Sequence, residues 1–244
     1  MDRINETAYP RVGLAGNPSD PYGGRGLGFS FVAWSVQLAL EPSDTLDLGE
    51  GHEVTAPLAE LLRAGWDVFR ESAGDLAEPD ALLGTAAALP GTGSLRDEGG
   101  PLWVTRGGEP WLGLRPFGVR VHNDIPRQAG LSGSSAVLIA LLRAVSRGAG
   151  LRLPAHRLAQ LAWRAEVERL GIRAGPLDRL VQAHDGLLAM DFARPWDPAA
   201  SVRVDAPWPG FLLAVDHEPG HASGDGQQEP RPGGGRKSTR LNSS

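Results

Sequence analysis

Hydrophobic and polar positions along the chain fall into short blocks that predict both strands and helices. Apolar runs bounded by turn residues predict strands at 11–16, 29–40, 111–121, 186–192 and 211–215. Apolar residues at helical spacing predict one helix entered at Pro57, one through the run 137–142 that ends near 148–150, and one opened by Pro154. Because the blocks do not alternate regularly between strand and helix, we expect an α+β fold.

Composition narrows the range of functions. The chain has 244 residues, of which 41% are hydrophobic and 22% charged, as in ordinary globular proteins. Its net charge of −5 argues against a nucleic-acid surface, and the absence of cysteine excludes disulfides and thiolate chemistry. Residues 1–10 are polar, and the apolar stretch 27–40 is too short and interrupted to span a bilayer. We therefore expect a cytoplasmic protein without nucleic-acid or membrane partners.

The stretch from Ile125 to Ala136 carries the strongest chemical signal. It is a loop rich in glycine and serine that opens directly into the apolar helical run 137–142. Such a loop lets backbone N–H groups approach a ligand closely, and the helix adds the positive end of its dipole. The pattern predicts a phosphate cradle, although a plain helix cap by Ser132, Ser134 or Ser135 is the simpler alternative. The cradle is not a Walker A loop, because the only lysine is Lys237.

Two other catalytic patterns are weaker. The run 130–134 is close to the nucleophile elbow of hydrolases, with Asp178 and His184 available downstream, but it ends in serine and follows residues that do not continue a strand. The run 217–221 has the letters of a zinc-protease motif. Pro219 and Gly220 between its histidines argue against the helix that such a motif needs, so we interpret it as a turn.

Several motifs together resemble those of the GHMP small-molecule kinases. The loop Ile125-Pro-x-x-Ala-Gly-Leu-Ser-Gly-Ser-Ser-Ala136 is similar to the family's phosphate-binding motif, and residues 11–24 are similar to its N-terminal substrate motif. Ala165-Glu166 and the run 175–179 correspond to its Ala-Glu and Gly-x-x-Asp elements. Residues 17–20 and 125–128 look specifically like glucuronokinases. The resemblance spans roughly residues 11–223.

The resemblance implies a role for each matching residue. Ala129, Gly130, Leu131, Ser132, Gly133, Ser134 and Ser135 would hold the phosphates of ATP, and Ser135 and Glu166 would hold Mg²⁺. Asp178 would accept the proton of the sugar hydroxyl, and Arg11 would stabilise charge on the attacking oxygen. Asn17 and Asp20 would orient the sugar, while Arg25 or Arg127 would bind a substrate carboxylate. The implied reaction is phosphorylation of a sugar or sugar acid, with glucuronate to glucuronate 1-phosphate as the preferred case.

Each of these residues also has a structural interpretation. Glu166, close to Glu168, could belong to a solvated helix face, and Asp178 could cap a helix. The implied alternatives in function are another GHMP kinase, or a kinase-like domain that binds sugar or nucleotide without turnover.

The family resemblance implies a ribosomal-protein-like N-terminal domain followed by a ferredoxin-like C-terminal domain. Nothing after Val215 resembles the family's C-terminal glycine-rich motif, so we expect that second domain to be mostly missing and the activity of this chain to depend on it. Gln128 and Gly133 also depart from the commonest phosphate motif. We assign residues 8–223 to the kinase domain and its continuation. Residues 224–244, rich in Gly, Pro and polar residues, form an expected disordered and non-native tail.

Overall fold

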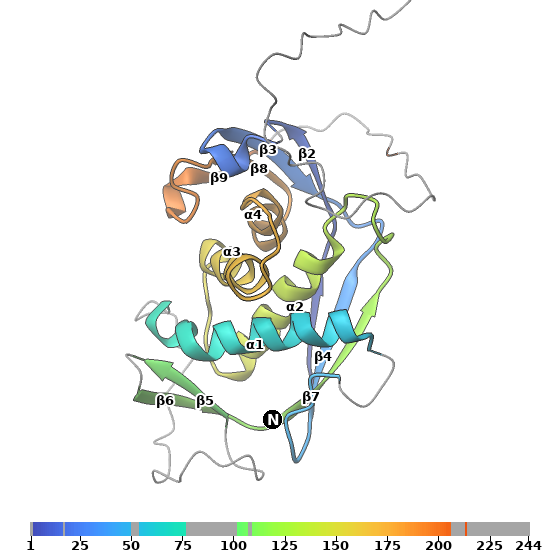
Figure 1. The fold of residues 1–244 in the computed structure, drawn as a ribbon, viewed down its shortest axis with the longest axis vertical. Helices are drawn as coiled ribbons and strands as arrows, with labels where there is room; N and C mark the ends of the chain where they lie inside the picture. Colours follow the sequence, from blue (N-terminus) through green and yellow to red (C-terminus); the bar gives the residue numbers. More distant parts are fainter. Residues whose placement is uncertain are drawn as a thin grey trace, which may run out of the picture.

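The computed structural model describes residues 2–16, 18–49, 54–76, 102–106, 109–205 and 213 (Figure 1). The described part of the chain contains two antiparallel sheets of three and four strands. The first sheet has the order β1 (Ile4–Ala8), β4 (Val36–Pro42), β7 (Phe117–Asn123). The second has the order β2 (Arg11–Ala15), β3 (Arg25–Ser30), β8 (Leu187–Asp191), β9 (Ser201–Arg203). A separate hairpin joins β5 (Leu102–Arg106) to β6 (Glu109–Leu114).

The helices pack around a central one. They are α1 (Ala56–Leu76), α2 (Gly133–Gly148), α3 (Ala155–Trp163), a π-helix (Arg164–Arg169) that continues α3, and α4 (Leu177–His184). Short 3-10 turns occupy Asp20–Tyr22 and Pro198–Ala200. Helix α2 contacts α1, α3, α4, β1 and β4, and its residues from Ser135 to Leu142 are all buried. A helix that is apolar on every side needs such a position, and the expected α+β fold is confirmed.

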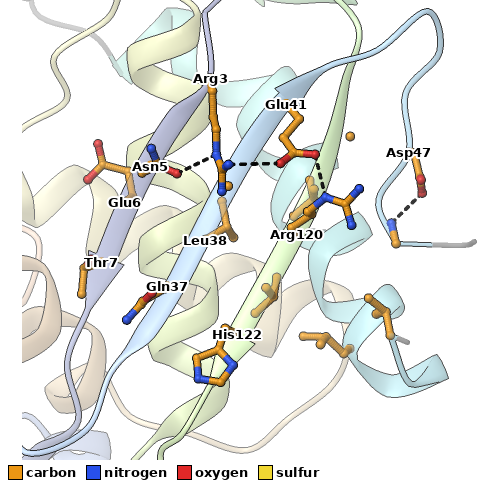
Figure 2. A pocket seen from close by; sticks show the side chains of 17 residues that line it. Arg3, Asn5, Glu6, Thr7, Gln37, Leu38, Glu41, Asp47, Arg120 and His122 are labelled. Carbon is orange, nitrogen blue, oxygen red and sulfur yellow. Dashed lines mark hydrogen bonds and ion pairs between the residues drawn. The ribbon is translucent and has the colours of Figure 1, made fainter. Parts of the chain in front are cut away.

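The first sheet buries one face and exposes the other. Val36, Leu38 and Leu40 of β4 are in the core, whereas Gln37 is exposed. A cavity of about 500 Å³ lies over this sheet, and Figure 2 shows a ladder of charged side chains across it. In that ladder Arg120 Nε donates to Glu41 at 2.6 Å, which lowers the pKa of the Glu41 carboxyl. None of the predicted site residues that the structure describes lines this cavity.

Two predicted strands are wrong in their extent. The strand expected at 29–40 is divided into β3 and β4 by a turn at residues 31–35, and the two halves belong to different sheets. Because β3 pairs with β2 and β8 while β4 pairs with β1 and β7, one straight strand could not serve both. The strand expected at 111–121 is likewise divided into β6 and β7 at Arg115 and Pro116, where proline supplies no N–H to a ladder.

The other described elements follow the sequence pattern. The strand predicted at 11–16 is β2, and the one at 186–192 is β8. Helix α1 begins one residue before Pro57, Pro154 caps α3, and α2 ends just before Gly150, whose φ of +72° is left-handed. None of the helices within the described ranges is both long and apolar enough to cross a membrane. Apart from Leu213, the strand predicted at 211–215 lies outside the described residues, as do the histidine motif and the predicted tail.

Candidate active site

The predicted phosphate cradle lies at the N-terminus of α2 and has an unusual backbone. Gln128, Gly130 and Ser132 have φ angles of 57°, 69° and 60°. These values lie in the left-handed region, which residues other than glycine seldom adopt. Ser132 is the N-cap residue, but its side chain makes no capping hydrogen bond. The plain serine cap that the sequence allowed is therefore not formed by Ser132. The first-turn N–H groups are left for another acceptor, such as an anion.

The Ser132 hydroxyl instead donates a hydrogen bond to Asp178, which also accepts one from Arg11. Arg11 Nε donates to Asp178 Oδ1 at 2.6 Å, and Ser132 Oγ donates to Asp178 Oδ2 at 2.6 Å. Arg11 also donates to the carbonyl oxygen of Gly130 at 2.9 Å, which ties β2 to the cradle. Burial alone would raise the pKa of Asp178, but the positive charge and hydrogen bond of Arg11, with help from Arg179 and Ser132, lower it to about 2. Asp178 is therefore ionised at neutral pH. It lies in the first turn of α4, whose N-cap is Pro176.

This arrangement does not form a serine-hydrolase triad. The hydroxyl of Ser132 is hydrogen-bonded to a carboxylate and not to a histidine. His184 lies at the C-terminal end of α4, and its buried Nε2 has no hydrogen-bond partner within the described ranges. Burial lowers the pKa of His184, and neighbouring His156 and Arg203 lower it further. The hydrolase alternative therefore lacks its base.

Gln182 is a site residue that the sequence reasoning missed. Its Nε2 donates to the carbonyl oxygens of Ser132 at 3.0 Å and Tyr9 at 3.1 Å, and the residue is fully buried. Gln182 and Asp178 are four residues apart, so they lie on one face of α4 and both contact Ser132. This four-residue spacing from Asp178 is the sequence signal that could have identified Gln182 as a site residue. Helix α4 thus holds the strained N-cap of α2 at two points.

Glu166 and Arg179 form a buried ion pair beneath the cradle. The Glu166 side chain is 1% exposed and that of Arg179 is 3% exposed. Arg179 Nε donates to Glu166 Oε2 at 2.6 Å, and Nη2 contacts the same oxygen. Ser134 Oγ donates to Glu166 Oε1 at 2.8 Å, and Ser135 Oγ donates to Oε2 at 3.1 Å. The alternative of Glu166 on a solvated helix face is therefore wrong; its neighbour Glu168 is the exposed residue.

Asp20 reaches the same region from the 3-10 turn after β2. Its Oδ2 accepts a hydrogen bond from the backbone N–H of Leu177 at 3.4 Å. A side chain at Gly175 would have its Cβ only 2.0 Å from that oxygen, so the absence of a side chain there makes room for Asp20. Burial raises the pKa of the Asp20 carboxyl, and the nearby charge of Asp178 raises it further.

A cavity of about 740 Å³ brings most of the predicted residues together. Its walls include Arg11, Asp20, Gly130, Leu131, Ser132, Gly133, Ser134 and Asp178. Arg127, Gln128 and Arg173 also line it. Ala129, Ser135 and Glu166 are not in its walls; the last two lie behind Ser134. Asn17 lies outside the described residues.

The position of Arg25 does not fit its predicted role. Arg25 is absent from the walls of this cavity, and its 86% exposed side chain pairs with Asp191 at 3.4 Å. The reason is the position of β3: Arg25 opens that strand opposite Asp191 of β8. Among the cations that line the cavity, Arg127 and Arg173 form no ion pair within the described part of the chain. Either one could meet an anionic ligand here.

The donors near Glu166 are compatible with a hard divalent cation. Within the described ranges no group of three or more Asp, Glu, His or Cys side chains could hold a metal by itself. The hydroxyls of Ser134 and Ser135 and the Glu166 carboxylate are oxygen donors of the kind that Mg²⁺ prefers, and they become a complete set only with water or phosphate oxygens. A cation at this position would therefore need further oxygen ligands from water or phosphate.

Comparison with known proteins relates this site to a family. The sequence model described as "GHMP kinases N terminal domain" matches residues 103–186, which include the cradle, Glu166 and Asp178. The part of the chain that carries the candidate site is therefore similar to a GHMP kinase N-terminal domain. The family resemblance expected from the motifs is confirmed.

Relatives over longer stretches are sugar kinases. The chain is 29% identical over 197 residues to glucuronokinase 1 of Arabidopsis thaliana and 33% identical over 193 residues to probable glucuronokinase 2 of that plant. These matches cover 78% and 77% of this chain but 49% and 48% of the relatives, so the chain spans about half the length of the curated relatives it matches. A galactokinase of Thermotoga neapolitana is 38% identical over 70 residues, which is 29% of this chain and 20% of that protein.

Solved structures show the same fold at low identity. Phosphomevalonate kinase of Streptococcus pneumoniae, in complex with phosphomevalonate and AMPPNP, matches with a TM-score of 0.56 and 13% identity. The match covers 82% of this chain and 59% of that one. At this identity the likeness concerns the fold alone.

Proposed function

We propose that this chain carries the nucleotide- and sugar-binding site of an ATP-dependent kinase that phosphorylates a hydroxyl group of a sugar or sugar acid. The most specific form of the proposal is the conversion of glucuronate to glucuronate 1-phosphate. One observation carries it: the pair of Arg11 and Asp178 lies in the same cavity as the helix terminus that forms the cradle. Phosphoryl transfer requires little more than positioned phosphates, a positioned hydroxyl and charge neutralisation.

In the proposed reaction the sugar hydroxyl faces Asp178. The oxygen of the sugar hydroxyl forms a bond to the γ-phosphorus of ATP, and the bond from that phosphorus to the ADP oxygen breaks. The hydroxyl proton passes to the Asp178 carboxylate. A carboxyl group with a pKa of about 2 is a weak base, so Asp178 would first orient the hydroxyl and take the proton late in the transfer. The guanidinium of Arg11 would stabilise the charge on the attacking oxygen.

The cradle residues from Ala129 to Ser135 would hold the ATP phosphates through backbone N–H groups at the start of α2. Ser135, Ser134 and Glu166 would hold the Mg²⁺ ion that accompanies the nucleotide. When bound, that ion would neutralise phosphate charge. The oxygen donors around Glu166 support this assignment.

The sugar would lie on the Asp20 side of the cavity. Asp20 faces Gly175 and Leu177 there and offers a carboxylate oxygen to sugar hydroxyls. For a uronic acid, Arg127 or Arg173 would supply the cation for the substrate carboxylate, because both line the cavity and Arg25 does not. Asn17, whose placement is not described, keeps its predicted role in sugar binding.

Two alternatives each have a specific observation behind them. The galactokinase match favours another sugar as substrate. The lowered pKa of Asp178, about 2, makes its carboxylate a weak base and favours a chain that binds nucleotide and sugar without turnover.

Phosphate transfer from ATP to a panel of sugars separates these possibilities. The panel should include glucuronate, galactose and glucose, and the assay should compare this chain with an Asp178→Asn variant. Transfer to glucuronate that the variant loses would support the proposal. Transfer to galactose alone would support a different sugar kinase. Magnesium-dependent nucleotide binding without transfer would support the non-catalytic alternative, and absence of both would refute the proposal for this chain.

A further inference from the structure

Arg179 has no assigned part in the reaction, although it lies between the two carboxylates of the site. It is contributed by α4, directly after Asp178, and its side chain turns inward to Glu166 of the π-helix. Nη1 donates to the carbonyl oxygen of Gly175 at 2.8 Å and is 3.9 Å from Asp178 Oδ2. A single guanidinium thus contacts the loop beneath the sugar side and the carboxylate beneath the cradle.

The two oxygens of Glu166 have different partners. Oε2 receives Nε and Nη2 of Arg179 as well as the hydroxyl of Ser135. Oε1 receives the hydroxyl of Ser134 at 2.8 Å and a longer contact from Ser135 at 3.4 Å. Ser134 is exposed and lines the cavity, whereas Ser135 is buried. Oε1 is therefore the oxygen on the side of the cavity, and Arg179 occupies the other.

A purely structural pair explains this arrangement poorly. Removing two charges from water costs several kcal/mol per ion, and well-packed apolar residues at such positions are often at least as stable. The pair also contacts the exposed Ser134 and lies beside the ionised Asp178. A position next to the cavity is not required of an ion pair that only stabilises the fold. Partners that hold a metal-binding carboxylate in one orientation commonly have this geometry.

We propose that Arg179 is a positioning residue for the cation of the proposed kinase, and this inference rests on the proposed function. Arg179 holds Oε2, so that Oε1 and the hydroxyls at the start of α2 face a cation that arrives with ATP. It also compensates the charge of Glu166. A free divalent cation therefore meets no net negative charge at Glu166, and binding of the cation depends on the phosphates of the nucleotide.

The test measures how much a divalent cation strengthens nucleotide binding. Calorimetric titration of the full chain with AMPPNP, in Mn²⁺ and then in EDTA, gives two dissociation constants whose ratio reports the cation. The variants are Arg179→Lys, which keeps the charge but loses the planar fork, Glu166→Gln, and the double variant Glu166→Gln/Arg179→Gln. The matched control is Arg143→Lys. Arg143 is a part-buried arginine whose guanidinium donates to the carbonyl oxygens of Thr7, Gln182 and Ala183 and to the carboxylate of Asp185.

We expect Arg179→Lys to weaken AMPPNP binding in Mn²⁺ by about tenfold, as for other partners of metal ligands, without changing binding in EDTA. Arg143→Lys should lower the thermal midpoint but leave both constants unchanged. Because Arg179 acts through Glu166, the double variant should bind as Glu166→Gln does. This comparison removes both buried charges together, so it remains informative if Arg179→Lys does not fold.

Three results would overturn the inference. Unchanged binding of Mn²⁺ and AMPPNP by Arg179→Lys, with a loss in Glu166→Gln, would leave Arg179 structural and the proposed function intact. A further loss in the double variant would show that Arg179 acts through another group. Wild-type protein that binds no AMPPNP under either condition would refute the proposed function and the inference with it.

Discussion

The ion pair of Arg11 and Asp178 makes a quantitative prediction about stability in acid. Asp178 carries a pKa of about 2 in the folded chain against an ordinary value of 3.8. A carboxyl whose pKa is lowered by folding stabilises the folded state when ionised, and the contribution is lost as the pH falls through the folded pKa. The side chain of Asp178 is 22% exposed, so solvent screens the pair only in part.

The size of this contribution follows from the two pKa values. At 1.36 kcal/mol per pKa unit, the shift corresponds to about 2 kcal/mol of unfolding free energy above pH 4. We expect Asp178→Asn to be less stable than wild type by about this amount at pH 7, because the variant leaves Arg11 without its charged partner. The difference should shrink between pH 4 and pH 2, where wild-type Asp178 becomes protonated.

Urea unfolding followed by circular dichroism at pH 7, 4, 3 and 2 measures both effects. Asp20→Asn is the control of opposite sign: burial raises the pKa of Asp20, so its ionised form disfavours folding, and this cost appears as the pH rises above 3.8. Asp20→Asn should therefore be no less stable than wild type at pH 7. A constant gap between Asp178→Asn and wild type from pH 4 to pH 2 would refute the reasoning.

Other substitutions test the site by binding and stability. Gly175→Ala would put a Cβ 2.0 Å from the Asp20 carboxylate, so we expect weaker glucuronate binding by calorimetry with nucleotide binding unchanged; equal loss of both would contradict this. Gly130→Ala meets no atom within 4 Å, but its φ of +69° should cost about 1 kcal/mol, which thermal unfolding would show as a lower midpoint. Arg25→Gln should leave glucuronate binding unchanged, and a clear loss would return Arg25 to the site. Arg173→Gln should weaken glucuronate binding but not glucose binding, and equal affinities would remove Arg173 from substrate recognition.

Local signals predicted the elements whose neighbours lie close in sequence. The proline at 154, the glycine at 150 and the apolar run 137–142 marked where α2 and α3 begin and end, because caps and periodicity act within a few residues. The strand at 29–40 was misjudged for the same reason. Apolar residues recur along the whole stretch and are separated only by single polar residues. The change of sheet at residues 31–35 instead depends on strand partners in β1, β2, β7 and β8.

The candidate site likewise contains residues that local sequence predicted and residues that only the tertiary structure revealed. Short motifs predicted the cradle, Glu166, Asp178 and Arg11 as site residues, because the residues of each motif are close together in the sequence. They did not reveal Arg179 or Gln182, whose partners are 13 and 50 residues away. The burial of Glu166, the displacement of Arg25 and the lowered pKa of Asp178 also depend on which distant groups lie within a few ångströms. The sequence by itself determined which chemistry is available, and the tertiary structure decided which charges meet, because electrostatic interactions depend on distance in space and on the exclusion of water.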